Sequence, residues 1–139
     1  MRGISLLLLG ATLVSCTAAP PEPMRSVRAQ TRYDQLLAGK VAGRPQSCLP
    51  SYNANDMVTI DDSTVAFKRG TRTVYVNHMQ GGCTNLASGS YALLTHQFGG
   101  AGLCRGDIAQ VVDTLNHITV GSCVFGDFIP YSRPGVRTY

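Results

Sequence analysis

The stretch MVTIDDSTVAFKRGTRTVYVN (residues 57–77) indicates the fold, because short β-branched runs alternate with turn signals. The predicted strands cover residues 57–60, 63–68 and 71–77, with Asp61-Asp62 and Arg69-Gly70 as the turns between them. Strands this short, joined by turns this tight, pair with their sequence neighbours as antiparallel hairpins.

The same pattern continues toward the C-terminus. Further strands are predicted over residues 91–98, 108–113 and 118–124, separated by glycine-rich segments and by the Asn116-His117 turn. Six or seven short strands at this spacing predict a mainly β domain, either a small antiparallel barrel or a sandwich. One short helix is expected over residues 29–38, because Tyr33, Leu36 and Leu37 share a helical face and Gly39 suits the stop.

The first residues have the layout of an export signal. Met1-Arg2-Gly3 is a short positive segment, residues 4–9 are apolar, and Leu13-Val14-Ser15-Cys16 closes the run. A membrane-spanning helix needs roughly 20 apolar residues, which this run does not supply. The four closing residues resemble the lipobox of bacterial lipoproteins. That resemblance implies cleavage before Cys16, and acylation of its thiol with palmitate-type chains.

The resemblance divides the chain into four parts: a lipoprotein signal peptide (1–15), a lipidated Cys16 with a Pro-rich tether (16–28), a disulfide-stapled β domain (29–131) and a flexible basic tail (132–139). Thr17 follows the cysteine where an Asp would signal inner-membrane retention, so a lipid-anchored location in the outer membrane, facing the periplasm, is expected. A soluble secreted protein cut after Ala18 is the alternative.

The other four cysteines, Cys48, Cys83, Cys104 and Cys123, predict two disulfides in an exported domain. Three pairings are possible, and we favour Cys48–Cys83 with Cys104–Cys123, which joins sequence neighbours. A four-cysteine metal site would need closely spaced pairs such as C-x₂-C, which the chain lacks.

Composition restricts the function classes. The chain has 139 residues, so the mature part is long enough for one domain only. Its net charge of +4, or +3 after loss of Arg2, is too small and too scattered to indicate nucleic-acid binding. The membrane, reached through the lipid anchor, is the first expected partner.

Four short motifs carry a second resemblance, over residues 33–131. They are residues 37–43 leading to Cys48-Leu49, Asn77-His78-Met79 leading to Cys83, residues 103–108, and residues 121–128. Together they are similar to a group of small proteobacterial lipoproteins whose cysteine-paired domain has no assigned function. The resemblance implies an envelope location and paired cysteines, and it supplies no catalytic residue, metal or cofactor.

Candidate chemistry is limited to scattered residues. His78, His96 and His117 lack the spacing of a metal motif but could converge from different strands. Asp107 and Asp127 are the most notable carboxylates, and hydrogen bonding to loop backbone is the expected role of both. Four aromatic residues are candidates for an exposed binding patch: Tyr52, Tyr75, Tyr91 and Phe98.

The sequence therefore predicts a membrane-anchored envelope lipoprotein with a periplasm-facing binding or structural module, whose partner is an envelope protein or a small apolar ligand. One alternative is an inhibitor of a periplasmic or cell-wall hydrolase. Lysozyme inhibitors of this kind present a Ser-Gly-x-x-Tyr loop, to which Ser88-Gly89-Ser90-Tyr91 is similar but one residue short. The other alternative is a small envelope enzyme that uses His and Asp residues.

Overall fold

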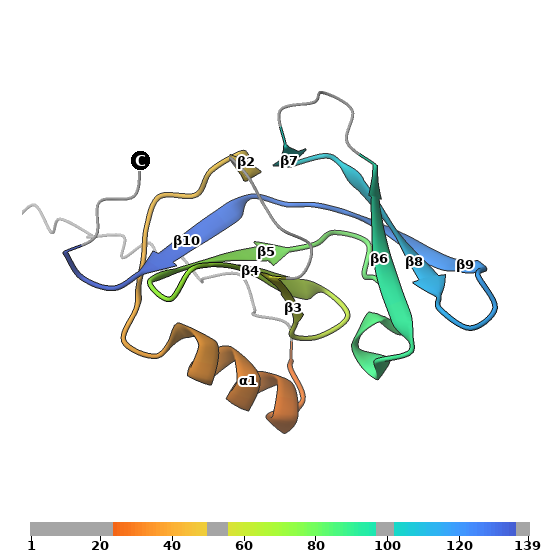
Figure 1. The fold of residues 1–139 in the computed structure, drawn as a ribbon, viewed down its shortest axis with the longest axis horizontal. Coiled ribbons are helices and arrows are strands. Elements are labelled where there is room, and N and C mark those ends of the chain that lie inside the picture. The colour runs from red at the N-terminus through yellow and green to blue at the C-terminus, as the bar shows by residue number, and fades with distance from the viewer. Residues whose placement is uncertain (1–23, 50–55, 97–101, 136–139) are drawn as a thin grey trace, which may run out of the picture.

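The computed structural model describes residues 24–49, 56–96 and 102–135 (Figure 1). These ranges hold one α-helix, a short 3-10 turn and ten strands: α1 (Val27–Leu37), β1 (Val41–Ala42), β2 (Cys48–Leu49), β3 (Met57–Thr59), β4 (Thr64–Arg69), β5 (Thr73–His78), η2 (Leu86–Ser88), β6 (Tyr91–His96), β7 (Leu103–Cys104), β8 (Ile108–Asp113), β9 (Thr119–Val124) and β10 (Phe128–Ser132).

The strands form three antiparallel sheets, in the orders β1-β10-β5-β4-β3, β2-β7 and β6-β8-β9. Within the described ranges the sheets do not close into a barrel, and the arrangement is sandwich-like. The predicted fold class is confirmed: mainly β, with one short N-terminal helix and two disulfides.

The helix α1 covers one face of the five-stranded sheet (Figure 1). It starts at Val27 because the Ser26 hydroxyl accepts a hydrogen bond from the Ala29 amide at 3.2 Å, so the expected range of 29–38 began too late. The predicted apolar face is confirmed, since Tyr33, Leu36 and Leu37 pack against four buried residues of β4, β5 and the β3–β4 turn: Ile60, Ala66, Val74 and Val76. No helix in the described ranges is long and apolar enough to cross a membrane.

The main core lies on the other face of this sheet. Three phenylalanines occupy its centre, with ring centroids of Phe125 and Phe128 6.0 Å apart and Phe67 at 6.0 to 6.4 Å from both. Leu49 and Leu103 from the β2-β7 pair and Val111 of β8 belong to the same cluster. Strand β5 is consequently buried on both faces, between α1 and the main core.

One long segment connects two of the sheets. Strand β9 leads directly into β10 through Phe125, Gly126 and Asp127, and Figure 1 shows the two strands following one another across the molecule. We call residues 125–127 the crossing. Just before it, the end of β9 is held to Gln80, whose amide and carbonyl both bond to Val124 at 2.8 and 3.0 Å. The crossing therefore fixes how the two sheets lie relative to each other.

The disulfides link Cys48 to Cys104 and Cys83 to Cys123, so the favoured pairing of sequence neighbours is wrong. Strand order decides the pairing. Cys48 lies directly opposite Cys104 in the β2-β7 pair, while Cys83 follows the Gln80 bridge that runs beside β9. The bonded residues are 56 and 40 positions apart. Loops of this length each contribute about 4 kcal/mol by constraining the unfolded chain.

Four strands were not predicted from the sequence: β1, β2, β7 and β10. Three of them have only two residues, too short for any periodicity. Strand β10 contains Pro130, which normally argues against a central strand. The structure tolerates Pro130 because β1 ends at Ala42, opposite Tyr131, so no residue of β1 lies opposite the proline. The Pro130 carbonyl still accepts a hydrogen bond from the Gly43 amide at 2.7 Å. Strand β10 also shows that Ser132, expected to begin a flexible tail, is part of the sheet.

Candidate functional site

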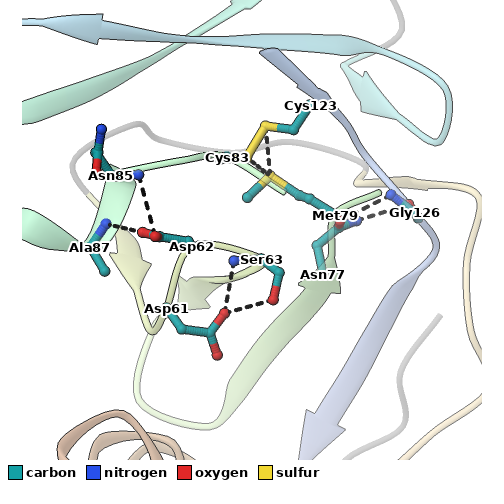
Figure 2. The surroundings of a disulfide bond; sticks show 10 residues. All are labelled: Asp61, Asp62, Ser63, Asn77, Met79, Cys83, Asn85, Ala87, Cys123 and Gly126. Atoms are coloured by element: carbon teal, nitrogen blue, oxygen red, sulfur yellow. Dashed lines mark hydrogen bonds between the residues drawn. A yellow bond between two sulfur atoms is a disulfide. The ribbon is translucent and has the colours of Figure 1, made fainter. Parts of the chain in front are cut away.

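Several polar contacts surround the Cys83–Cys123 disulfide (Figure 2). Asp62 holds the segment after Cys83: its carbonyl accepts the Cys83 amide at 2.6 Å, and its carboxylate accepts the amides of Ala87 at 2.8 Å and Asn85 at 3.3 Å. These bonds fix η2, and Asn85 takes the left-handed backbone conformation that the turn requires. The carboxylate is thus engaged in holding backbone.

Asp61 has a comparable role in the neighbouring turn. One of its oxygens accepts the amide and the hydroxyl of Ser63, at 2.8 and 2.9 Å, and the other pairs with Arg25 at 3.1 Å. The Arg25 guanidinium is nearly buried and lies 4.4 Å above the centre of the Tyr33 ring. This ion pair attaches the segment before α1 to the β3–β4 turn.

The Asn77 side chain is hydrogen-bonded to the backbone of the crossing between β9 and β10. Its amide nitrogen donates to the Gly126 carbonyl at 2.8 Å, and its amide oxygen accepts from the Gly126 amide at 3.1 Å (Figure 2). Asn77 is completely buried, so these two bonds and a third to the Asp127 carbonyl at 3.3 Å satisfy groups that would otherwise lie unpaired in the core. Position 126 also has no room for a side chain, because a Cβ there would lie 2.5 Å from the His78 carbonyl oxygen.

Three sulfur atoms lie in contact in the core beside Asn77. The sulfur of Met79 lies 3.4 Å from that of Cys83 and 3.8 Å from that of Cys123. Both cysteine sulfurs are oxidised and carry no hydrogen, so these are packing contacts between polarisable atoms. With Cys83 at 0% and Cys123 at 2% exposure, this disulfide is a structural bond closed to solvent reductants.

The histidines expected as possible metal or acid-base groups lie on separate elements. His78 ends β5, the exposed His96 ends β6, and His117 lies in the β8–β9 turn. Within the described residues, no group of three His, Cys, Asp or Glu side chains is placed to hold a metal ion. His117 shares its turn with Asp113, where hydrogen bonds from Asn116 and Leu115 lower the pKa of the Asp113 carboxyl. Those bonds make Asp113 a turn-forming residue.

The two carboxylates singled out in the sequence also bond within their own loops. Asp107 is nearly buried and accepts the Cys104 amide at 2.7 Å, so it closes the turn between β7 and β8. Asp127 forms an exposed ion pair with Arg105 at 3.2 Å, of a kind that contributes at most about 1 kcal/mol. Their expected role in holding loop backbone is confirmed for Asp107.

The expected aromatic patch does not form as predicted. Tyr75 is 2% exposed and belongs to the main core, because β5 is covered on both faces. Tyr91 is half-buried and packs against the same cluster. Tyr52 and Phe98 lie outside the described residues. Cys16, the expected lipidation site, also lies outside them.

Two cavities border the start of α1. One, of about 290 Å³, is lined by residues of α1 and of the segment before β6: Ser26, Arg28, Ala29, Arg32, Ile60, Ala87, Ser88 and Gly89. The other, of about 330 Å³, lies between Met24, the β3–β4 turn and Ala87. Arginine, serine and aspartate side chains contribute to their walls, so neither is the apolar pocket expected for a small apolar ligand.

The sheet β6-β8-β9 has one face in the core and one outside. Residues 93, 109, 111 and 123 point inward, while the alternate positions form what we call the outer face: Ala92, Leu94, His96, Ile108, Gln110, Val112, Ser122 and Val124. Leu94 is 50% and Ile108 40% exposed. None of these eight outer-face residues is an Asp, Glu, Lys or Arg.

Positive charge is concentrated elsewhere. Lys68, Arg69 and Arg72 lie at the β4–β5 turn, and Arg133 joins them because its amide bonds to the Arg72 carbonyl at 3.3 Å. All four residues are exposed. We call this group the basic end, and its existence modifies the expectation that charge is merely scattered.

Comparison with known proteins identifies no relative: no protein family, no curated protein and no solved structure matches the chain.

Sequence reasoning missed the outer face, although a signal for it was present. In residues 91–96 the pattern is YALLTH, with Leu at two successive positions, and successive strand residues point to opposite faces. The two leucines therefore point to opposite faces, and one of them is exposed wherever only one face of the strand is covered. Asp62 and Asn77 carried no comparable signal, because their partners lie 25 and 49 residues away in the sequence.

Proposed function

We propose that this chain is an exported, lipid-anchored envelope protein whose β domain is a binding or structural module that uses the outer face of the β6-β8-β9 sheet. The observation that carries the proposal is the outer face itself, where aliphatic side chains are exposed and formal charges are missing. Surfaces of this kind mark contact sites when their apolar residues are contiguous. The partner is expected to be an envelope protein.

The export part of the proposal is supported by cysteine usage. All four cysteines of the described residues are in disulfides, which form and persist in oxidising compartments. The described core residues lie between Ala29 and Tyr131, so removal of the first 15 residues would take nothing from those clusters. A diacylglycerol on Cys16 would supply two buried chains, enough for stable attachment.

Fractionation of cells that express the full chain tests the anchor. The wild-type protein is expected in the outer membrane, and Cys16→Ala is expected to remain as uncut precursor. Thr17→Asp is the matched control, because it leaves the acylation site intact and is expected to shift the protein toward the inner membrane. Recovery of wild type and Cys16→Ala in the same soluble fraction would refute the anchor.

A photo-crosslinking amino acid tests the binding surface. Placed at Leu94, it is expected to give a discrete adduct in intact cells, and Ile108→Lys in the same chain should abolish that adduct. Val41 is the control position, because it is 61% exposed on β1 and does not belong to the outer face. Equal adducts from both positions, or none from Leu94, would contradict the assignment.

A second candidate, the hydrolase inhibitor, is favoured by the loop before β6. Residues 87–90 are exposed, Gly89 takes a positive φ of 85°, and Ser90 is held by the β8–β9 turn. An ordered, exposed loop is what a substrate-like inhibitor needs. The purified protein would then inhibit lysozyme, and Ser88→Lys would remove the inhibition. Full lysozyme activity at saturating protein would eliminate this candidate for lysozyme.

A further inference from the structure

Four aliphatic side chains are exposed around one end of the domain. Met24 and Val27 at the start of α1 are 102% and 85% exposed, while Leu115 and Ile118 of the β8–β9 turn are 80% and 55% exposed. Single exposed aliphatic residues are normal, whereas a group of them on one side marks a contact site.

The contacts between these segments place them on the same side. Met24 and Ala87 line one cavity, and Ser26 and Gly89 line the adjacent one. The next residue, Ser90, accepts two hydrogen bonds from Thr114, from its amide at 3.2 Å and its hydroxyl at 2.9 Å. The loop before β6 therefore lies between the start of α1 and the β8–β9 turn, and Figure 1 shows the three segments from the lower centre of the molecule to its right edge.

The turn presents its two aliphatic residues in a fixed geometry. The Asp113 carboxylate accepts the amides of Leu115 at 2.8 Å and Asn116 at 3.0 Å. The Asp113 amide donates to the Ile118 carbonyl, and its carbonyl accepts the His117 amide, both at 2.9 Å. Because the turn is already ordered, little conformational entropy is lost when its side chains bind a surface.

The length of chain between the proposed anchor and the domain restricts which side can face the membrane. Eight residue steps separate Cys16 from Met24, and a fully extended chain of this length spans at most about 28 Å. A domain of this size is on the order of 35 Å across. The tether therefore keeps the end that carries Met24 within about 28 Å of the bilayer, a distance shorter than the width of the domain.

We infer that the bilayer itself is the partner of this end: Leu115 and Ile118 insert into the interfacial region of the membrane, with Met24 and Val27 beside them. This inference rests on the proposed anchor at Cys16. Exposed Arg28, next to Val27, supplies positive charge for lipid phosphates. In this orientation the outer face and the basic end stay accessible to the periplasm, whereas the loop before β6 faces the membrane.

The chain contains no tryptophan, so a single introduced tryptophan reports without background. The mature protein, with its native N-terminus, is reconstituted into phosphatidylethanolamine–phosphatidylglycerol vesicles as Leu115→Trp and as Leu94→Trp. Both positions are at least half exposed, so both variants should fold. With the anchored protein, Leu115→Trp emission should shift to shorter wavelength and lose most of its intensity to brominated lipid chains, while Leu94→Trp should change in neither respect. Ile118→Trp is a second reporter and should behave like Leu115→Trp.

Three results would overturn the inference: no quenching at 115 or 118, equal quenching at 94 and 115, or quenching at 94 alone.

Mass measurement of the same samples shows independently whether Cys16 is acylated. If it is not, the anchor proposal fails, and the same tryptophans are read with free protein added to the vesicles. A shift at 115 alone would then keep the membrane contact, and Leu115→Asn should weaken vesicle binding about tenfold through lost apolar burial. An unchanged spectrum would eliminate both ideas. Insertion at 115 would also leave the loop before β6 unable to enter a hydrolase.

Discussion

Replacement of Gly126 by alanine is expected to destabilise the domain strongly, because the crossing between β9 and β10 has no space for a methyl group. A Cβ at this position would lie 2.5 Å from the backbone oxygen of His78, which is not a flexible neighbour. Overpacking of this kind costs about 1–3 kcal/mol. Displacement of the crossing would also weaken the two hydrogen bonds between Asn77 and Gly126, at about 1 kcal/mol each. The expected loss is roughly 3–5 kcal/mol, or about 12–20 °C in Tm.

The neighbouring strand offers a matched control. Gly121→Ala is the same substitution in β9, but the nearest atom to its Cβ is the Thr84 amide nitrogen at 3.9 Å, an ordinary contact. Thermal unfolding followed by circular dichroism, with both disulfides intact, gives the two values. The reasoning predicts that Gly126→Ala unfolds well below Gly121→Ala. If the two variants have equal Tm values, the crossing is not the close contact described above.

Three more predictions follow from the same contacts. The pKa of Asp113 is lowered by its hydrogen bonds to Asn116 and Leu115. The ionised carboxylate therefore stabilises the turn fully above the Asp113 pKa of the unfolded chain, and this stabilisation is lost as the pH falls through the lower pKa of the folded protein. An NMR titration that gives Asp113 an ordinary pKa would contradict this. Asp62→Ala should loosen η2, so hydrogen exchange at the Ala87 amide becomes faster while exchange at Val76 changes little. Unchanged exchange at Ala87 would show that the Asp62 carboxylate does not hold η2. Mild reductant should open Cys48–Cys104 before Cys83–Cys123, because only the first pair is partly exposed, and peptide mapping that finds the reverse order would refute the argument.

The regular part of the fold was predictable because its signals are local. The strands near residues 57–77 have β-branched runs with their own turn residues, and the structure places β3, β4 and β5 there within one or two residues. The face of α1 followed from Tyr33, Leu36 and Leu37, which are neighbours in the helix. Hairpins and amphipathic faces of this kind are determined by residues close together in sequence.

The features that were missed depend on residues far apart in sequence. The disulfide pairing follows from the order of strands in space, with Cys48 opposite Cys104 across a pair of two-residue strands. Strand β10 is tolerated despite Pro130 because β1 stops beside it. Tyr75 was expected at the surface because alternation shows that a strand has two faces, but not that both are covered.

The same limit applied to the candidate site. Histidine and aspartate positions could be named from the sequence, but whether they meet is a matter of topology, and His78, His96 and His117 end up on three separate elements. The exposure of Leu115 and Ile118 was equally invisible, because a turn with aliphatic residues reads in sequence like the end of a buried strand.

Non-reducing peptide mapping by mass spectrometry, on protein purified from its native membrane, tests the central claim most directly. The account predicts an N-terminal peptide that begins at acylated Cys16, together with disulfide-linked peptides that join Cys48 to Cys104 and Cys83 to Cys123. A chain that still begins at Met1 with unmodified thiols at all five cysteines would contradict it.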